Sequence, residues 1–197
     1  MIIFLLLVRN ASVSSTNCVN SSKTITAVTE KEHKHIFEIW LKQYKGVIFK
    51  VVRAYAFNIM DQEDLFQEIV IQVWHSVPAF RQESAVTTWI YRIALNIAIK
   101  WVRKEQKHNQ TQTLDQTNIS EPVLLENNPK TDERLDWLYE QISRLDAIDR
   151  SLALLLLDDF SYKEMAGIVG ITESNVGVRI NRIKKHLITK VKNDYGL

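Results

Sequence analysis

Glycine, proline and cysteine are scarce in this sequence. Its 197 residues contain five glycines, three prolines and a single cysteine, Cys18. So few glycines and prolines leave little material for hairpin turns or glycine-rich phosphate loops, and the sequence therefore predicts an all-α fold. One cysteine excludes a disulfide within the chain and a cysteine-based zinc site. It also favours a reducing compartment, the cytoplasm.

The apolar run at residues 2–8 is too short to be a membrane span. Its seven residues fall well below the roughly 20 that a transmembrane helix needs. The run also lacks the basic start and the small-residue cleavage site of a secretory signal. We therefore expect no stable membrane insertion. Residues 1–29 are expected to form a disordered extension, with the folded protein beginning near Thr29.

Charge of one sign does not dominate, but it is unevenly distributed. The net charge is +2, from 25 basic and 23 acidic residues. Basic residues cluster in residues 100–107 and 179–192, whereas the charged residues within 108–133 are five acids and a single base, Lys130. This arrangement is expected when two modules bind a polyanion and their connector stays away from it. The length suits one large or two small domains.

The apolar periodicity predicts helices along most of the chain and requires no strand. The first helical segment covers residues 35–58, and Gly46 is expected to divide it into two helices. The next begins at Asp61 and ends at Pro78, and another begins with Ser84 as its N-cap. Two more cover residues 135–145 and 148–157. The polar residues 109–129 indicate a flexible linker.

The most specific local pattern predicts a helix-turn-helix in residues 161–187. Ser161 caps a short helix, Gly170 permits the turn and Thr172 caps a longer helix. In that longer helix Val176, Ile180, Ile183 and Leu187 recur at helical spacing, which defines the buried side. The opposite side then presents Ser174, Asn175, Val178, Arg179, Asn181, Arg182 and Lys185.

These side chains suit the major groove of DNA. Asn pairs with adenine, Arg pairs with guanine, and Val contacts the thymine methyl group. Nearby lysines can bind phosphates, which positions the helix without specifying sequence. The alternative interpretation is a solvated basic helix at the end of a bundle.

Four carboxylates, Asp61, Glu63, Asp64 and Glu68, gather at the start of the second predicted helix. They are compatible with simple helix capping, a divalent-metal site, or a docking face for a basic partner. The metal site is disfavoured, because the cluster lacks the ligand alternation of a calcium loop and no His lies at a suitable helical offset.

A basic stripe lies on the helix that follows Ser84. Arg92, Asn96, Lys100 and Arg103 share one polar face, close to three aromatic residues, Trp89, Tyr91 and Trp101. Basic groups beside aromatic rings can hold single-stranded nucleic acid. The alternative is that the aromatic residues belong to the core, and Trp101 in particular is expected to pack inward.

Four motifs resemble those of the sigma-70 superfamily, specifically its extracytoplasmic-function group. Residues 61–68 (DQEDLFQE) and 89–96 (WIYRIALN) resemble two motifs of region 2. Residues 161–166 (SYKEMA) and 176–182 (VGVRINR) resemble two motifs of region 4, in the same order. Two departures occur: Asp146 follows Leu145 where the family usually has Pro, and Gly177 replaces a residue that is often basic.

The resemblance implies a two-domain sigma factor that directs bacterial core RNA polymerase to promoter DNA. It implies region 2 over residues 30–107, a linker over 108–130 and region 4 over 131–193. Asp61, Asp64, Gln67 and Glu68 would bind the polymerase. The promoter -10 element would contact Arg81, Ser84, Arg92, Asn96, Lys100 and Arg103, with a flipped base held by residues 81–86. The helix-turn-helix residues above would bind the -35 element.

The resemblance also allows an anti-sigma factor as a partner, and it implies no catalysis, cofactor or metal. Two rival hypotheses remain at this point. A helix-turn-helix regulator with an unrelated sensor domain would share only the second half of the pattern. A metal-dependent enzyme would need His partners for the carboxylates, and the five His residues are poorly placed for that role.

Overall fold

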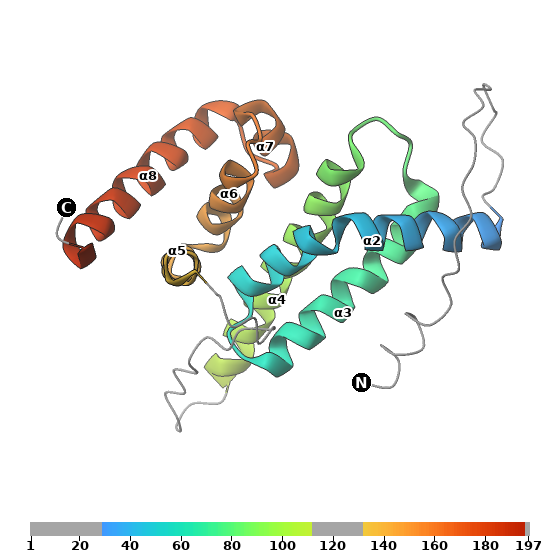
Figure 1. The fold of residues 1–197 in the computed structure, drawn as a ribbon, viewed down its shortest axis with the longest axis horizontal. Coiled ribbons are helices and arrows are strands. Elements are labelled where there is room, and N and C mark those ends of the chain that lie inside the picture. Colours follow the sequence, from blue (N-terminus) through green and yellow to red (C-terminus); the bar gives the residue numbers. More distant parts are fainter. Residues whose placement is uncertain (1–28, 112–131, 196–197) are drawn as a thin grey trace.

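The structure, a computed structural model, describes residues 29–111 and 132–195. Every regular element in these ranges is a helix, which confirms the all-α prediction. Two helical units follow one another along the chain (Figure 1). The first contains α2 (Glu30–Tyr55), α3 (Ile59–Ser76), the 3-10 turn η1 (Val77–Ala79) and α4 (Val86–Thr111). The second contains α5 (Glu133–Ser143), α6 (Ala147–Leu157), α7 (Tyr162–Val169) and α8 (Glu173–Tyr195).

Helix α2 is continuous, so the predicted break at Gly46 is wrong. A glycine inside a helix costs about 1 kcal/mol relative to alanine, and Gly46 is exposed. Buried Trp40 and Ile48 lie on either side of it and pack into the core of the first unit. Burying one such side chain contributes about 1.5–3 kcal/mol, so tertiary packing outweighs the local cost.

Two predicted helix starts are displaced by one or two residues. Helix α3 starts at Ile59 rather than at Asp61, because the side-chain oxygen of its N-cap, Asn58, accepts from the backbone N–H of Asp61 at 2.8 Å. The first carbonyl bonded within α4 belongs to Ala85, which accepts from Trp89 N–H at 3.1 Å. Ser84 therefore lies one residue before the cap position. Pro78 lies in η1, directly after α3 as predicted.

Helix α4 extends further than the sequence indicates. It runs to Thr111, beyond residue 108, where the linker was expected to begin. The remainder of the expected linker lies outside the described residues, as do residues 1–28 of the expected extension. Thr29 caps α2, and it does so in a capping box with Glu32.

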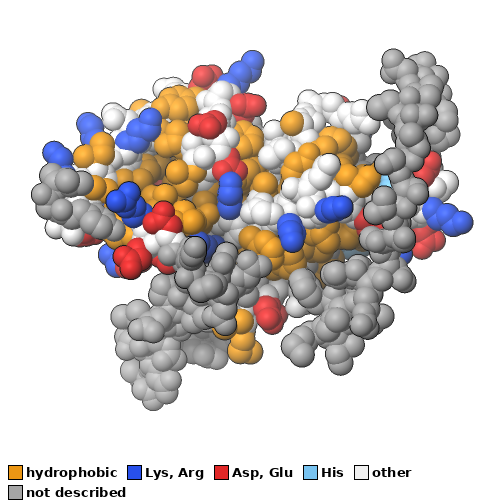
Figure 2. Space-filling view, viewed as in Figure 1, with side chains coloured by type: hydrophobic (Ala, Val, Ile, Leu, Met, Phe, Trp, Pro, Cys, Tyr) orange, Lys and Arg blue, Asp and Glu red, His pale blue; other side chains and the backbone are white. Residues whose placement is uncertain are grey.

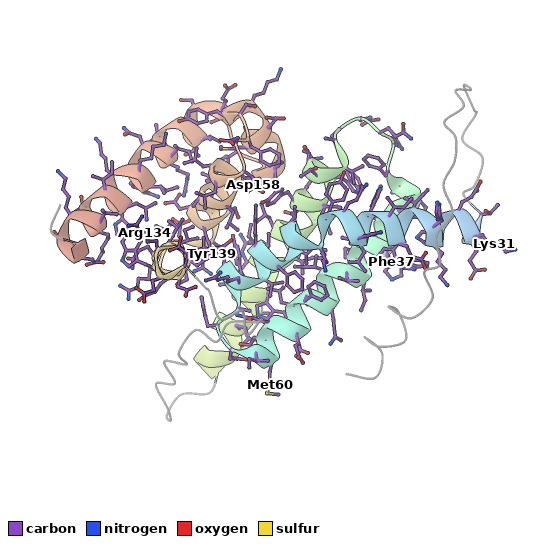
Figure 3. All side chains as sticks on the ribbon, viewed as in Figure 1. Lys31, Phe37, Met60, Arg134, Tyr139 and Asp158 are labelled. Carbon is purple, nitrogen blue, oxygen red and sulfur yellow. The ribbon has the colours of Figure 1, made fainter. Side chains whose placement is uncertain are left out.

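Polar contacts join the two units. Helix α4 packs on α6 and α7, and α2 packs on α5 and α6 (Figure 1). Asp158, just after α6, accepts from Tyr91 Oη and from Lys50 Nζ, each at 2.5 Å. Tyr55 Oη donates to the carbonyl oxygen of Ala147 at 2.6 Å. Figure 3 places Asp158 and Tyr139 on the side of the second unit that faces the first.

One buried cation, Arg150, lies at this contact. Arg150 is 7% exposed and stacks 4.8 Å from the ring of Tyr55. Its Nε and Nη1 are buried without a hydrogen-bond partner in the described part of the chain. Its Nη2, in contrast, donates to the carbonyl oxygens of Ser143 and Leu145, and burial lowers the pKa of the guanidinium. A polar interface of this kind is typical of units that move relative to one another.

Replacing Asp158 by Asn is expected to loosen the contact between the units. Hydrogen bonds to a charged group contribute about 1.5–3 kcal/mol, with less from the half-exposed Lys50 because water screens it. Small-angle X-ray scattering should give a larger radius of gyration for Asp158→Asn. Asp159→Asn, at the exposed neighbouring position, should match the parent protein. Equal radii for all three proteins would contradict this expectation.

Candidate nucleic-acid interface

The predicted acidic face of α3 is exposed. Asp64, Gln67 and Glu68 lie on the surface, and within the described residues neither carboxylate has an ion-pair partner. Asp61 differs, because it is half-buried and its carboxylate accepts from Asn58 Nδ2 at 2.7 Å. The structure therefore groups three of the four predicted residues and assigns Asp61 a part in the start of the helix.

Two apolar residues on the same face escaped the sequence analysis. Met60 is 78% exposed and Ile71 is 57% exposed. Their spacing from Asp64 and Gln67, at positions 60, 64, 67 and 71, places all four on one side of α3. Periodicity alone did not single them out, because apolar residues in a helix are normally assigned to the core.

The predicted basic stripe of α4 is exposed over most of its length. Asn96, Lys100 and Arg103 lie on the surface. Arg92 is half-buried, and its Nη2 donates to the carbonyl oxygen of Gly167 in α7 at 3.0 Å. The stripe thus runs from the contact between the two units outward along α4.

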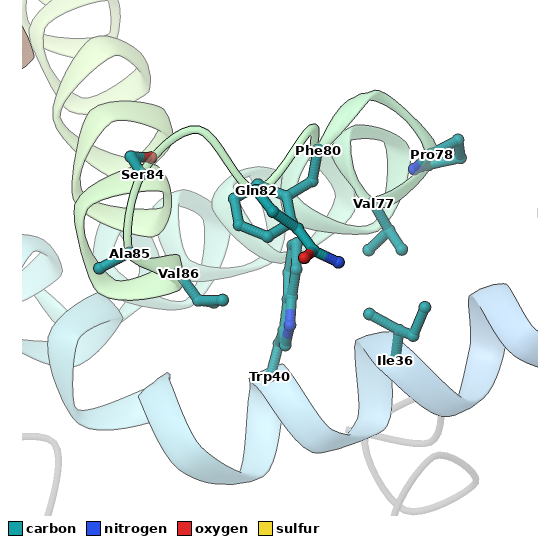
Figure 4. A pocket seen from close by; sticks show the side chains of 9 residues that line it. All are labelled: Ile36, Trp40, Val77, Pro78, Phe80, Gln82, Ser84, Ala85 and Val86. Carbon is teal, nitrogen blue, oxygen red and sulfur yellow. The ribbon is translucent and has the colours of Figure 1, made fainter. Parts of the chain in front are cut away.

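A hollow of about 520 Å³ lies between α2 and the loop before α4 (Figure 4). Trp40 and Phe80 form part of its wall, with their rings edge to face at 5.0 Å. Gln82 and Ser84 supply an amide and a hydroxyl group. Of the two loop residues predicted to bind DNA, Ser84 lines the hollow, whereas Arg81 is exposed and is not part of its lining.

The backbone of this loop is held in an uncommon conformation. Gln82 has a φ of 58°, a region that only a few per cent of residues other than glycine adopt. Such conformations tend to occur at binding sites. The family resemblance predicted the loop. The contribution of Trp40 was not predicted, because its spacing is that of a core residue, and its exposure of 6% is also that of a core residue.

The helix-turn-helix has the predicted geometry. Ser161 forms a capping box with Glu164, and Gly170 ends α7 with a φ of 79°. Thr172 Oγ1 accepts from the backbone N–H of Asn175 at 3.3 Å. Val176, Ile180 and Ile183 are buried. Of the seven residues predicted on the opposite side, six are exposed: Ser174, Asn175, Val178, Asn181, Arg182 and Lys185.

Arg179 is the exception, because it is drawn toward α6. Its Nη1 contacts the carboxylate of Asp149 at 2.6 Å and that of Asp146 at 3.5 Å. Arg182 Nη2 also donates to Asp149, through the other carboxylate oxygen. That hydrogen bond raises the pKa of Arg182. Lys and Arg side chains otherwise project along the edge of the molecule that α8 forms (Figure 2).

Two family models match the chain. The model of Sigma-70 region 2 matches residues 40–108, and the model of Sigma-70 region 4 matches residues 135–187. Together they cover more than half of the chain. The chain belongs to the sigma-70 family. It is a sigma factor of the extracytoplasmic-function group, a class of promoter-specific transcription initiation factors.

Curated relatives of this sigma factor cover most of its length. RNA polymerase sigma factor YlaC of Bacillus subtilis is 26% identical over 79% of this chain and 92% of its own. The ECF RNA polymerase sigma-E factor of Escherichia coli is 26% identical over 83% of this chain and 90% of its own.

Two solved structures share the fold of this sigma factor. Sigma factor RpoE of Bartonella quintana, in complex with the anti-sigma factor NepR, has a TM-score of 0.67 at 20% identity. The match covers 81% of this chain and 98% of that one. CnrH, in complex with the cytosolic domain of CnrY, has a TM-score of 0.58 at 17% identity, over 82% of this chain and 90% of that one.

Two further properties concern the described residues only. No group of three or more His, Cys, Asp or Glu side chains in residues 29–111 and 132–195 could hold a metal ion. None of the helices in those ranges combines the length and apolar character that crossing a bilayer requires.

Proposed function

We propose that this sigma factor binds core RNA polymerase through α3, the -10 element through α4 and its preceding loop, and the -35 element through α8. The first two functions belong to a domain over residues 30–107 and the third to a domain over residues 131–193. The observation that carries the proposal is that α4 and α8 each present a row of exposed polar and basic side chains. One chain thus offers two separate faces to nucleic acid.

Polymerase binding is assigned to Asp64, Gln67 and Glu68, with Asp61 supporting the start of their helix. Exposed carboxylates that have no ion-pair partner among residues 29–111 and 132–195 favour a basic partner surface. Met60 and Ile71 flank them and add apolar area at both ends of the face. An apolar contact of this kind supplies affinity that exposed ion pairs alone do not.

Melting of the -10 element is assigned to the stripe and the hollow. Arg92, Lys100 and Arg103 bind phosphates, and Asn96 can bind a base edge. Extruding one base costs a few kcal/mol, and stacking a base on an aromatic side chain returns about 1–3 kcal/mol. Trp40 and Phe80 offer such rings, and the hollow falls within the usual 300–1,000 Å³ of ligand pockets.

Shortening the Gln82 side chain should relax recognition of the flipped base. Gln82→Asn retracts the amide group by one methylene, and Asn tolerates positive φ, so the loop should keep its conformation. We expect a three- to tenfold loss of preference at one -10 position, in line with a lost hydrogen bond of about 1 kcal/mol. Transcription from promoters randomised at the -10 element measures this. Glu83→Gln, which changes a side chain that does not line the hollow, is the control.

Simultaneous binding of both elements requires the two units to separate. Elements named -35 and -10 lie about 25 base pairs apart, or about 85 Å at about 3.4 Å per base pair. In the structure Arg92, a proposed -10 contact, lies against Gly167. The seven residues from Gly167 to Ser174, the first proposed -35 contact, span at most about 25 Å. The contact between α4 and α7 must therefore open, which also frees Arg92 for DNA.

An anti-sigma factor is proposed as a further partner, because one structure of the same fold was solved with such a protein. The chain is proposed to act in the cytoplasm, on polymerase, with no catalysis and no cofactor of its own. Transcription from a randomised promoter library with purified core polymerase tests the function. We expect enrichment of two separated sequence elements, and enrichment of none would overturn the proposal.

A further inference from the structure

A single carboxylate, that of Asp149, binds both arginines of α8. Asp149 lies in the first turn of α6 and only 5% of its side chain is exposed. One oxygen, Oδ1, accepts from Arg179, and the other, Oδ2, accepts from Arg182. Its backbone N–H donates to Asp146 Oδ1 at 2.9 Å, which holds the backbone of Asp149 in the first turn of α6. A buried carboxylate near a helix N-terminus is favourably placed with respect to the helix dipole.

The two arginines differ in how much of each remains available. The side chain of Arg179 is 24% exposed, and that of Arg182 is 62% exposed. A guanidinium has five N–H donors, and within the described chain only Nη2 of Arg182 is bonded, to Asp149. Recognition of guanine uses two donors of one arginine. Arg182 can therefore keep its bond to Asp149 and contact a guanine with its other edge, whereas Arg179 is largely enclosed.

We propose, building on the assignment of α8 to the -35 element, that Asp149 is a positioning residue for promoter recognition. It orients Arg182 toward one base pair and keeps Arg179 as a tether between α8 and α6. An arginine side chain has considerable rotamer entropy to lose on binding, and Asp149 restricts that freedom before DNA arrives. The negative charge of Asp149 also offsets part of the positive charge of the two arginines. The arginines therefore add little to the sequence-independent attraction between the protein and DNA phosphates.

Asp149→Asn tests the proposal, since it preserves the shape of the side chain and removes its charge. The holoenzyme, full chain with core polymerase, is assayed on promoters randomised at the -35 element. The relevant position is the one whose preference disappears in Arg182→Ala. At that position Asp149→Asn should lower the preference about tenfold. The affinity for a duplex without a promoter should rise two- to fivefold, because the arginines are freed to contact phosphates. The logarithm of this affinity should also fall more steeply with the logarithm of the salt concentration, by the equivalent of about one phosphate contact.

A purely structural role for Asp149 predicts a different result. It would weaken preference at every -35 position and lower the affinity for random DNA as well. A double-mutant cycle separates the two cases: Asp149→Asn combined with Arg182→Ala should show the same -35 preference as Arg182→Ala alone. Asp146→Asn is the matched control, because Asn caps helices as well as Asp and Asp146 contacts the arginines only at 3.5–3.6 Å.

The outcomes also distinguish this inference from the proposed function. If the parent holoenzyme shows no -35 preference at all, the assignment of α8 fails. If it shows a preference that Asp149→Asn leaves unchanged, or if the two substitutions are additive, only the role of Asp149 is overturned. Thermal unfolding of Asp149→Asn, compared with Asp146→Asn, verifies that the second unit still folds.

Discussion

Asp64→Lys combined with Glu68→Lys is expected to weaken binding to core RNA polymerase at least 100-fold. The substitutions replace two exposed carboxylates with two lysines. These lysines carry the same sign of charge as a basic partner surface, and placing like charges opposite each other in an interface costs several kcal/mol. A loss of about 2.8 kcal/mol corresponds to 100-fold in the dissociation constant. The helix itself should be unaffected, because one like-charged pair at i and i+4 replaces another.

Fluorescence titration of core polymerase with the labelled chain measures this loss. The control is Glu38→Lys combined with Glu140→Lys, which changes the net charge equally but lies on α2 and α5. Each control site loses only an exposed i, i+4 ion pair, worth about 0.3–0.5 kcal/mol. An unchanged dissociation constant for the α3 variant, or an equal loss in the control, would contradict the assignment of this face.

Arg182→Ala is expected to lower the affinity of the holoenzyme for its promoter about 10- to 100-fold. A bidentate contact between arginine and guanine contributes about 1–3 kcal/mol of discrimination. The loss should be confined to promoters that carry the preferred base pair, and assembly with polymerase should remain close to normal. Competition binding on promoters with and without the -35 element measures the effect.

Lys185→Ala provides the comparison for Arg182→Ala. Lys185 is exposed further along α8 and suits a phosphate contact, so its loss should weaken binding to all sequences about equally and reduce the salt slope by about one. If Arg182→Ala behaved in the same uniform way, the arginine would be a phosphate contact. If it prevented holoenzyme assembly, the separation of functions between the two units would be wrong.

Local sequence signals predicted the helix-turn-helix correctly. Ser161, Gly170 and Thr172 are signals that act within a few residues, and the structure has all of them in place. The spacing of Val176, Ile180 and Ile183 likewise identified the buried side of α8. Such predictions succeed because the residues that determine the conformation lie within one or two helical turns of each other.

Contacts between distant residues could not be predicted in the same way. Asp149 binds Arg179 and Arg182, which lie 30 and 33 positions further along the chain. Nothing in the sequence of its own helix marked it as a partner of α8. The hollow joins Trp40 to Gln82, and Arg92 reaches Gly167 in the other unit. Periodicity assigns a residue to a face but does not say what packs against that face.

Binding of the purified full chain to bacterial core RNA polymerase tests the central claim most directly. The account predicts a saturable one-to-one complex that forms with the parent chain and is lost in the α3 charge-reversal variant. The same complex should open promoter DNA that carries both elements, while the Arg182→Ala complex should assemble but open that DNA poorly. A correctly folded parent chain with no affinity for core polymerase would contradict the account.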